Sequence, residues 1–379
     1  MIKKIFLLLL TFLIITIGYT YWIYSAKRTL IIPYPYSFTQ LAHKPLESEL
    51  QMANEAQILI IGDQMGANLK AFTPAIVSEL AHKFKSPPKI YNWSVPHEGL
   101  HRTLFKLTFL KKFPPIVLYH GASSELYEKI FSVSDKKAIL DNFNTYDDEK
   151  LISLIITFPW LSKILYKKMR YFDLGLLTEK KGQLSESEIM NEKEISFKLF
   201  SYQVRQLIEQ VKENKSNLIL MTTPLNLEIA PHQTCSFATS DKIIDAQKEL
   251  EILIQSGDYK SAYQLALPLA RETYSNATSY YLLGKILMGL GDLANARIAF
   301  QKATAFDCAN WRGNAVYNAI LKSQATLHQV ILIDFDQYMA SQLSHEALFN
   351  DDIFPQNLFY QTIIAELLVN LKKILSINN

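Results

Sequence analysis

Five short apolar runs constrain the fold of this chain more than any other feature of its sequence. They are residues 57–62 (QILIIG), 89–94 (KIYNWS), 115–120 (PIVLYH), 217–223 (NLILMTT) and 329–335 (QVILIDF). Runs of this length that are apolar on both faces indicate buried strands. Strands separated by helical segments predict a parallel sheet covered by helices on both sides. We therefore predict an α/β fold.

Helices are expected between and after these strands. Helical patterns cover residues 67–85, 100–112 and 358–375. In a parallel sheet with such helices, ligands bind at the carboxyl ends of the strands. Those ends hold three polar segments: Asp63-Gln64, Gly121 to Glu125, and Thr223-Pro224. The sequence thus predicts where a site lies, but the fold alone does not predict its chemistry.

Residues 126–215 form a long excursion between the third and fourth strands. It is mostly helical in pattern and rich in aromatic residues and lysine, as at Phe158, Trp160 and Lys167. We interpret it as a cap of helices over the sheet. Contact with a membrane surface is the alternative interpretation.

A repeat of 34 residues lies between the fourth and fifth strands. Gly257-Asp258 recurs as Gly291-Asp292, and Ala262 recurs as Ala296. This spacing, with Gly-Asp at the turns, resembles a pair of tetratricopeptide repeats, each made of two antiparallel helices. A plain helical hairpin is the alternative. Two repeats bury little surface by themselves, so we expect them to pack on the α/β body.

The N-terminus predicts a membrane anchor. Lys3 and Lys4 precede an uncharged apolar run over residues 5–24, a length that matches the hydrocarbon core of a bilayer. Aromatic residues crowd its far end, as interfacial residues do. A cleaved signal peptide is the alternative, but no small-residue cleavage site follows the run. Lys3 and Lys4 favour a cytoplasmic N-terminus, whereas Lys27 and Arg28 oppose it.

Composition excludes some classes of function. The net charge of +3 gives no electrostatic footprint for nucleic acid, and we expect no nucleic-acid partner. No cysteine and histidine spacing typical of a metal site occurs, so we expect neither a metal nor a cofactor. The two cysteines, Cys235 and Cys308, are expected to pair if the body lies in an oxidising compartment. Two separate buried thiols are the alternative.

These features divide the chain into five predicted parts. They are an anchor (1–27), a tether with a first helix (28–56), an α/β body (57–240) with its cap at about 126–215, a helical repeat insertion (241–306), and the C-terminal part of the body (307–379).

Four short blocks resemble the conserved blocks of SGNH/GDSL hydrolases, in the same order. Asp63-Gln64 follows the first strand within IGDQMG, and Asn92 precedes Gly99 within NWSVPHEG. Gly121 to Glu125 occupies the place of the Gly-x-Asn block, and Asp351 to Pro355 that of the Asp-x-x-His-Pro block. Together they cover nearly all of the chain outside the anchor and the insertions. The resemblance implies a flavodoxin-like parallel sheet, the three-layer sandwich of that superfamily.

The same resemblance implies that the catalytic residues are missing. Such a site needs a hydroxyl nucleophile, a histidine base and an aspartate that orients the base. Gln64 stands at the nucleophile position and Phe354 at the base position, and Ser123 or Ser124 replaces the asparagine. Only Asp63, Gly99 and Asp351 keep the pattern. Because the nucleophile and the base are missing, we expect no catalytic residue at the six positions of this degenerate site, which are Asp63, Gln64, Gly99, Ser123, Asp351 and Phe354.

A relocated pair of serine and histidine is the alternative, because His120 lies beside Ser123 and Ser124, with His97 and His101 in the neighbouring loop. The leading hypothesis is an extracytoplasmic pseudo-hydrolase, anchored by a single pass in the cytoplasmic membrane. It would bind envelope or membrane proteins through its repeats, with a glycan in the cleft as a further candidate ligand. The rival hypothesis is an active envelope acyl esterase or O-acyltransferase.

Overall fold

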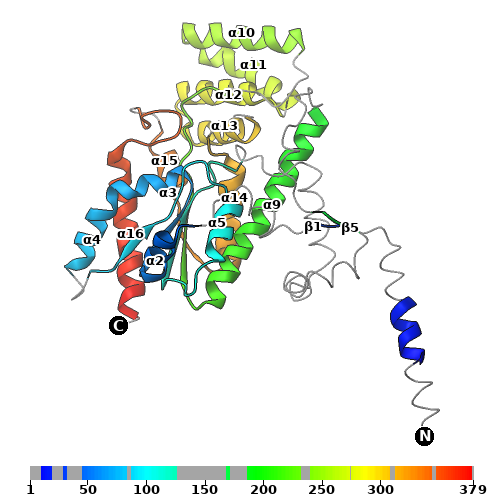
Figure 1. The fold of residues 1–379 in the computed structure, drawn as a ribbon. Helices are drawn as coiled ribbons and strands as arrows, with labels where there is room; N and C mark the ends of the chain where they lie inside the picture. The colour runs from blue at the N-terminus through cyan, green and yellow to red at the C-terminus, as the bar shows by residue number, and fades with distance from the viewer. Residues whose placement is uncertain are drawn as a thin grey trace. The chain divides into compact units, whose positions relative to one another are not determined.

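The computed structural model describes residues 10–18, 29–31, 45–82, 87–125, 168–170, 186–231, 240–273, 275–307, 312–343 and 347–377 (Figure 1). They fall into two compact units. The first unit comprises Met1–Lys44 and Lys129–Gly182, and the second comprises Pro45–Glu128 and Gln183–Asn379.

The first unit holds part of the predicted anchor. Residues 10–18 are helical, and β1 (Thr29–Ile31) pairs with β5 (Lys168–Arg170) as a two-stranded parallel sheet. Among the helices that the structure describes, none combines the length and apolarity needed to cross a bilayer. Most of the predicted anchor, residues 5–24, lies outside the described residues, so the anchor stays a prediction.

The second unit contains a five-stranded parallel sheet in the order β3-β2-β4-β6-β7. By order along the chain, these strands run 2-1-3-4-5, which is the flavodoxin-like arrangement. The predicted parallel sheet with helices on both faces is confirmed. Its strands are β2 (Ile58–Gly62), β3 (Ile90–Asn92), β4 (Ile116–His120), β6 (Asn217–Met221) and β7 (Ile331–Ile333).

The helices described in this unit are labelled in Figure 1, apart from the 3-10 helix η1. They are α2 (Glu47–Glu55), α3 (Gln64–Asn68), the 3-10 helix η1 (Leu69–Phe72), α4 (Thr73–Ala81), α5 (Leu100–Leu107), α9 (Glu186–Glu213), α10 (Asp241–Ser256), α11 (Tyr259–Glu272), α12 (Ala277–Gly289), α13 (Leu293–Phe306), α14 (Ala315–His328), α15 (Phe335–Ser341) and α16 (Asn357–Ile377).

Alternate residues of each strand face opposite layers. In β4, Ile116 and Leu118 pack with α4, α15 and α16, whereas Val117 and Tyr119 pack with α2, α5, α9 and α14. Both faces of β2 and β4 are buried along their whole length. Because the helices exclude water from both faces, these strands are apolar throughout rather than alternating.

Part of the predicted cap is a core helix instead. The cap was expected over residues 126–215, but α9 buries Phe200, Val204, Leu207 and Val211 against the sheet. These residues recur every three or four positions, which places them on one face of a helix. The earlier part of the predicted cap, except β5, lies outside the described residues.

Two other predicted boundaries differ from the structure. The helix expected over 67–85 is divided into α3, η1 and α4, and Pro74 stands in the first turn of α4, where its missing N–H costs no hydrogen bond. The strand expected over 329–335 is reduced to Ile331–Ile333. Gln329 ends α14 in a left-handed conformation, and Asp334 caps α15 by accepting from Gln337 N.

The repeat segment forms two helix pairs, α10 with α11 and α12 with α13, as the sequence predicts. Gly257 and Gly291 adopt positive φ at equivalent turns, which glycine tolerates without strain. Asp258 and Asp292 then cap the following helices through Ser261 N and Asn295 N. The pairs pack on the body through a shared apolar cluster that includes Leu225, Leu227, Ala340 and Leu343.

Candidate functional site

The predicted site residues Asp63, Gln64, Ser123 and Ser124 lie together at the carboxyl edge of the sheet. β2 and β4 are adjacent, and Gly62 is in register with His120 at their ends. Gly62 has a φ of 139°, and a Cβ there would overlap the backbone carbonyl of His120. A glycine is therefore needed for the two strands to end this close together.

Asp63 is the centre of a hydrogen-bond network. It is 1% exposed, and its Oδ1 accepts from Met65 N at 2.9 Å, which caps α3. Its Oδ2 accepts from Ser123 N at 2.7 Å, Ser123 Oγ at 2.7 Å and Ser124 N at 3.0 Å. Burial raises the pKa of the Asp63 carboxyl, and these four hydrogen bonds oppose that rise. The carboxylate thus fixes the loop after β4 onto the end of β2.

Gln64, at the nucleophile position, joins the same network. Its Oε1 accepts from Ser124 Oγ at 2.6 Å and from His97 N at 3.1 Å. The side chain is 6% exposed, and its Nε2 is buried without a partner among the described residues. The amide therefore connects the ends of β2 and β4 with the loop that follows β3.

Neither serine hydroxyl is directed at an imidazole. Ser123 Oγ donates to Asp63 and Ser124 Oγ donates to Gln64. His120 is the last residue of β4, and its Nδ1 is 3.4 Å from Met221 O while its ring packs near Phe335. Burial lowers the pKa of His120 to about 4. An imidazole with this pKa is a poor general base at neutral pH.

Gly99 lies at the N-terminus of α5, as the helical pattern over residues 100–112 predicts. Its φ of −75° is extended backbone. The next N–H, of Leu100, donates to Glu125 Oε1 at 2.8 Å. The N-terminus of a helix favours a negative charge, and the Glu125 carboxylate already supplies one. A developing oxyanion there would meet a charge of the same sign.

A buried ion pair holds the loop that carries Gly99. Lys106 Nζ lies 2.7 Å from Glu98 Oε1 and donates to Trp93 O at 2.6 Å. Thr103 Oγ1 also donates to Glu98 Oε1 at 2.8 Å. Burial raises the pKa of the Glu98 carboxyl, and the Lys106 ammonium opposes the rise. Breaking such a pair leaves an uncompensated buried charge, so its role here is to fix the loop.

Asp351 and Phe354 belong to a closed loop. Asp351 Oδ1 accepts from Ile353 N at 2.8 Å and from Phe354 N at 2.7 Å, so the carboxylate caps its own turn. A bridge between Phe349 and Pro355 closes the loop. Within the described part of the chain, no hydrogen bond joins Asp351 to Asp63, Gln64 or Ser123. The loop contacts the segment after β6 through Asn226 Nδ2, which donates to Asp351 O at 3.1 Å.

The predicted pair of Cys235 and Cys308 lies outside the described residues, and so it stays a prediction.

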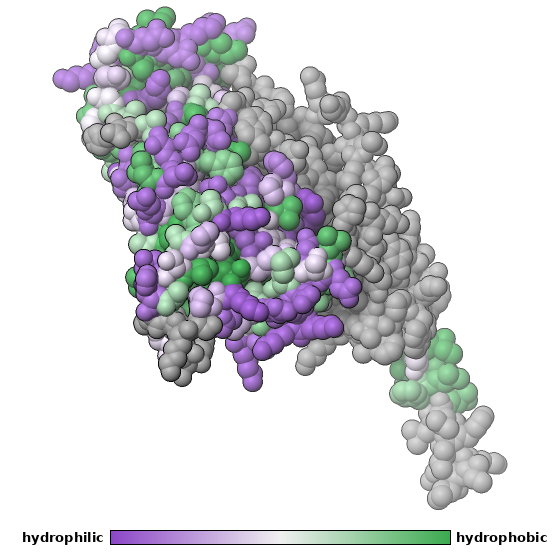
Figure 2. Space-filling model, turned by 60° about the vertical axis from the view of Figure 1, so that its left-hand side comes forward, coloured by the Kyte–Doolittle hydropathy of each residue, from purple (hydrophilic) through white to green (hydrophobic). Residues whose placement is uncertain are grey.

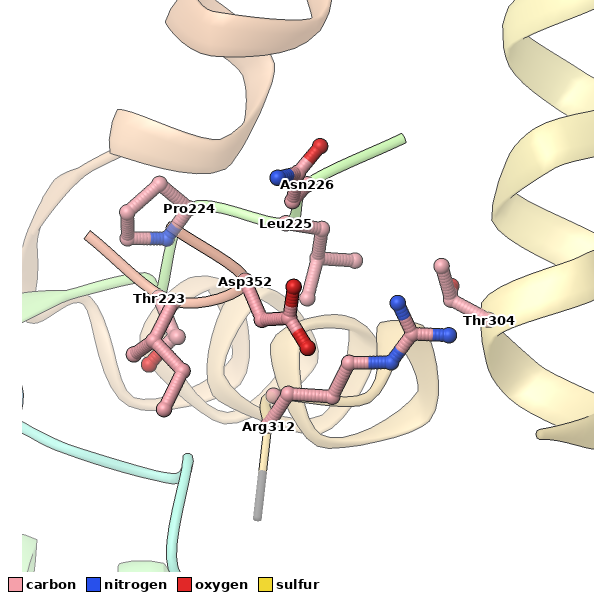
Figure 3. A pocket seen from close by; sticks show the side chains of 9 residues that line it. Thr223, Pro224, Leu225, Asn226, Thr304, Arg312 and Asp352 are labelled. Carbon is pink, nitrogen blue, oxygen red and sulfur yellow. The ribbon is translucent and has the colours of Figure 1, made fainter. Parts of the chain in front are cut away.

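A pocket beside this loop is not predicted from the sequence. It lies where the segment after β6 meets the end of the repeats, and Figure 3 shows Arg312, Asp352 and Thr304 around it. Its volume is about 10 Å³, which is room for about one water molecule. The lining residues are Thr223, Pro224, Leu225, Asn226, Thr304, Arg312, Gly313, Asp352 and Ile353. They come from four separate segments, so no local pattern could bring them together.

Comparison with known proteins gives one family match. Residues 277–307 match the tetratricopeptide repeat, and they cover α12 and α13. This confirms the second predicted repeat. No curated protein matches the chain.

Solved structures give a fold-level likeness. One is a GDSL-like lipase from Bacteroides thetaiotaomicron, at 10% identity and a TM-score of 0.33, covering 90% of this chain and 99% of that chain. Another is an α/β hydrolase enzyme from the metagenome of Lake Arreo, Spain, at 12% identity and a TM-score of 0.35, covering 83% and 94%. At these identities and TM-scores, the likeness carries no argument about the family or the activity of this chain.

Proposed function

We propose that this chain is a non-hydrolytic relative of the SGNH hydrolases that binds protein partners through its repeats. One observation carries the first part. The hydroxyls of Ser123 and Ser124, after β4, donate to the side chains of Asp63 and Gln64, which accept structural hydrogen bonds. A serine becomes a nucleophile when a base removes its proton. The imidazole of His120, the nearest in sequence, contacts Met221 O and Phe335 instead.

The binding role rests on the repeat. Tetratricopeptide repeats in general serve protein–protein interaction, and residues 277–307 match that family. The apolar run over residues 5–24 favours attachment to the cytoplasmic membrane by one pass, with the body outside the cytoplasm. In that compartment the partners would be envelope or membrane proteins.

The outer helix of the repeats offers a surface for this role. Ile252, in α10, is 66% exposed, and Ile244 on the same helix is 37% exposed. They are eight residues apart, which places them on one face of the helix. Hydrophilic and hydrophobic side chains are mixed over the part of the molecule that Figure 2 presents. The outer face of a terminal repeat is usually polar, which keeps the protein soluble. Exposed apolar residues at this place therefore indicate contact with another protein.

Crosslinking in intact membranes, followed by capture of the tagged full chain, tests this proposal. We expect Ile252→Glu to reduce capture of specific envelope proteins at least fivefold, because a carboxylate would be buried in the interface. Val369→Glu is the matched control, since Val369 is 67% exposed but lies on α16. Capture that is equal in both variants, or lost in both, would contradict a role for the repeats.

A further inference from the structure

Lysine residues gather at the edge of the five-stranded sheet where its strands begin, which we call the amino edge. All five strands are parallel, so every segment that enters a strand lies at this edge. Adjacent strands lie about 4.8 Å apart, so the row from β3 to β6 is roughly 15 Å long. The entering segments carry Lys89 before β3, Lys111 and Lys112 before β4, and Lys212 and Lys215 before β6.

The last part of α16 adds two lysines to the amino edge. Lys372 Nζ lies 3.7 Å from Glu79 Oε2, and Glu79 is close to the end of α4, which leads to β3. Lys373 is the next residue and is exposed. Figure 1 shows the C-terminal end of α16 at the end of this unit that lies away from the repeats. These seven lysines are accompanied by three glutamates, Glu55, Glu79 and Glu213.

Four of the seven lysines have no counter-charge among the described residues. They are exposed, and no ion pair in the described part of the chain involves them: Lys111, Lys112, Lys215 and Lys373. Asn54 Oδ1 accepts from the backbone N–H groups of Lys111 and Lys112 at 3.0 and 3.2 Å, which fixes the turn that carries two of them. The amino edge therefore presents positive charge to its surroundings.

One of these lysines occupies a position that favours glycine. Lys215 has a φ of 55° after the end of α9, where Ser216 N donates to Val211 O at 3.0 Å. A side chain in this left-handed conformation costs conformational energy that glycine does not. The repeats of the same chain have glycine at such turns, Gly257 and Gly291. A charge retained at the expense of stability indicates that the charge has a use outside the fold.

An exposed leucine lies beside the lysines. Leu327, in the last turn of α14, is 71% exposed, and the backbone oxygen of the next residue, His328, accepts from Lys212 Nζ at 2.7 Å. Lysines together with exposed apolar side chains are typical of surfaces that lie on anionic lipid, because the head groups attract the ammonium groups and the apolar side chain enters between them.

Nucleic acid suits this surface less well. Its recognition relies strongly on the planar guanidinium group of arginine, whereas lysine acts as a point charge without a fixed geometry. The described segments of the amino edge contain no arginine. A diffuse negative surface, such as a layer of lipid head groups, is therefore the better complement.

We propose that the amino edge binds the surface of a membrane that contains anionic lipids. The proposed attachment through residues 5–24 would bring the chain to such a surface, but the electrostatic attraction does not depend on it. The inference goes beyond the proposed binding of protein partners, because that role uses α10, at the opposite end of this unit (Figure 1).

Lysine footprinting of the full chain with lipid nanodiscs tests this inference. Neutral discs contain phosphatidylcholine alone, and anionic discs contain it with an equal amount of phosphatidylglycerol. An ammonium group held against head groups reacts more slowly with an acetylating N-hydroxysuccinimide ester, and mass spectrometry locates each modified lysine. We expect labelling of Lys111, Lys112 and Lys215 to fall at least threefold in anionic discs. Labelling should recover in about 0.5 M sodium chloride, which screens the attraction. Lys260 and Lys302, which are exposed lysines of the repeats, should be labelled equally in both discs.

Charge reversal sharpens the test. The double variant Lys111→Glu with Lys112→Glu should return the labelling of Lys215 to its value in neutral discs. Lys260→Glu with Lys302→Glu is the matched control, since it makes the same change in the repeats, and it should leave Lys215 protected. Lys215→Gly should keep the urea midpoint at or above that of wild type while it reduces the protection of Lys111.

Three results would overturn the inference: equal labelling in the two kinds of disc, protection that persists in high salt, or an equal effect of the two double variants. Protection of these lysines by a short DNA duplex, with none by anionic discs, would assign the amino edge to nucleic acid instead. None of these results changes the capture expected for Ile252→Glu, so failure here is distinguishable from failure of the proposed function.

Discussion

Asp63→Ala should lose at least about 4 kcal/mol of unfolding free energy, because it leaves four donors without their acceptor. These donors are Met65 N, Ser123 N, Ser123 Oγ and Ser124 N. Each buried group left unsatisfied costs about 1–3 kcal/mol. Urea denaturation followed by tryptophan fluorescence, to which the buried Trp93 contributes, would measure the loss as a lower midpoint.

Two further variants test this result. Asp63→Asn keeps one acceptor oxygen, so its midpoint should lie between those of wild type and Asp63→Ala, and it serves if Asp63→Ala does not fold. Asp258→Ala is the matched control. It removes an exposed aspartate that caps α11 through one hydrogen bond, and its loss should be clearly smaller. If Asp63→Ala lost no more than Asp258→Ala, the network would not be holding the strand ends together.

His120→Gln should remove an acid-sensitive component of the stability. Burial lowers the pKa of His120 to about 4 in the folded protein, whereas the unfolded value is 6.5. Between these two values only the unfolded chain binds the proton, so falling pH favours unfolding. The difference of about 2.5 units corresponds to about 3 kcal/mol, lost as the pH falls from 7 to 4.

The stability of His120→Gln must be compared with that of wild type at each pH. This is needed because the titration of Asp336 changes the stability with pH in the opposite direction to that of His120. Burial raises the pKa of the Asp336 carboxyl to about 6, so its folded form takes up a proton first and acid stabilises it. Asp336 is present in both proteins and cancels in the difference. The advantage of wild type over His120→Gln should therefore shrink by about 3 kcal/mol between pH 7 and pH 4. Parallel stability curves for the two proteins would contradict the burial of a neutral imidazole.

Much of the fold follows from local patterns in the sequence. All five strands, the last helix and both helix pairs of the repeats are predictable, because each has a periodicity or a turn signal of its own. The exceptions have physical reasons. Residues 67–81 are helical in pattern throughout, and the periodicity does not mark the change to η1. The apolar face of α9 does not reveal whether it covers the sheet or forms part of a cap.

The candidate site is predictable in position but not in detail. Asp63 and Ser123 follow adjacent strands, so their proximity follows from the strand order. The direction of each hydrogen bond depends on the path of the loops after β3 and β4, which the sequence does not specify. The Arg312 pocket depends on how the repeats pack on the segment after β6.

The proposed lack of hydrolase activity depends on the roles of Ser123 and Ser124. If their hydroxyls only hold Asp63 and Gln64, neither serine can attack an ester. The most direct measurement is the initial rate of p-nitrophenyl acetate hydrolysis by the full chain beside Ser123→Ala and Ser124→Ala. We expect all three rates to equal that of the buffer. Turnover by the wild type that disappears in either variant would contradict the account.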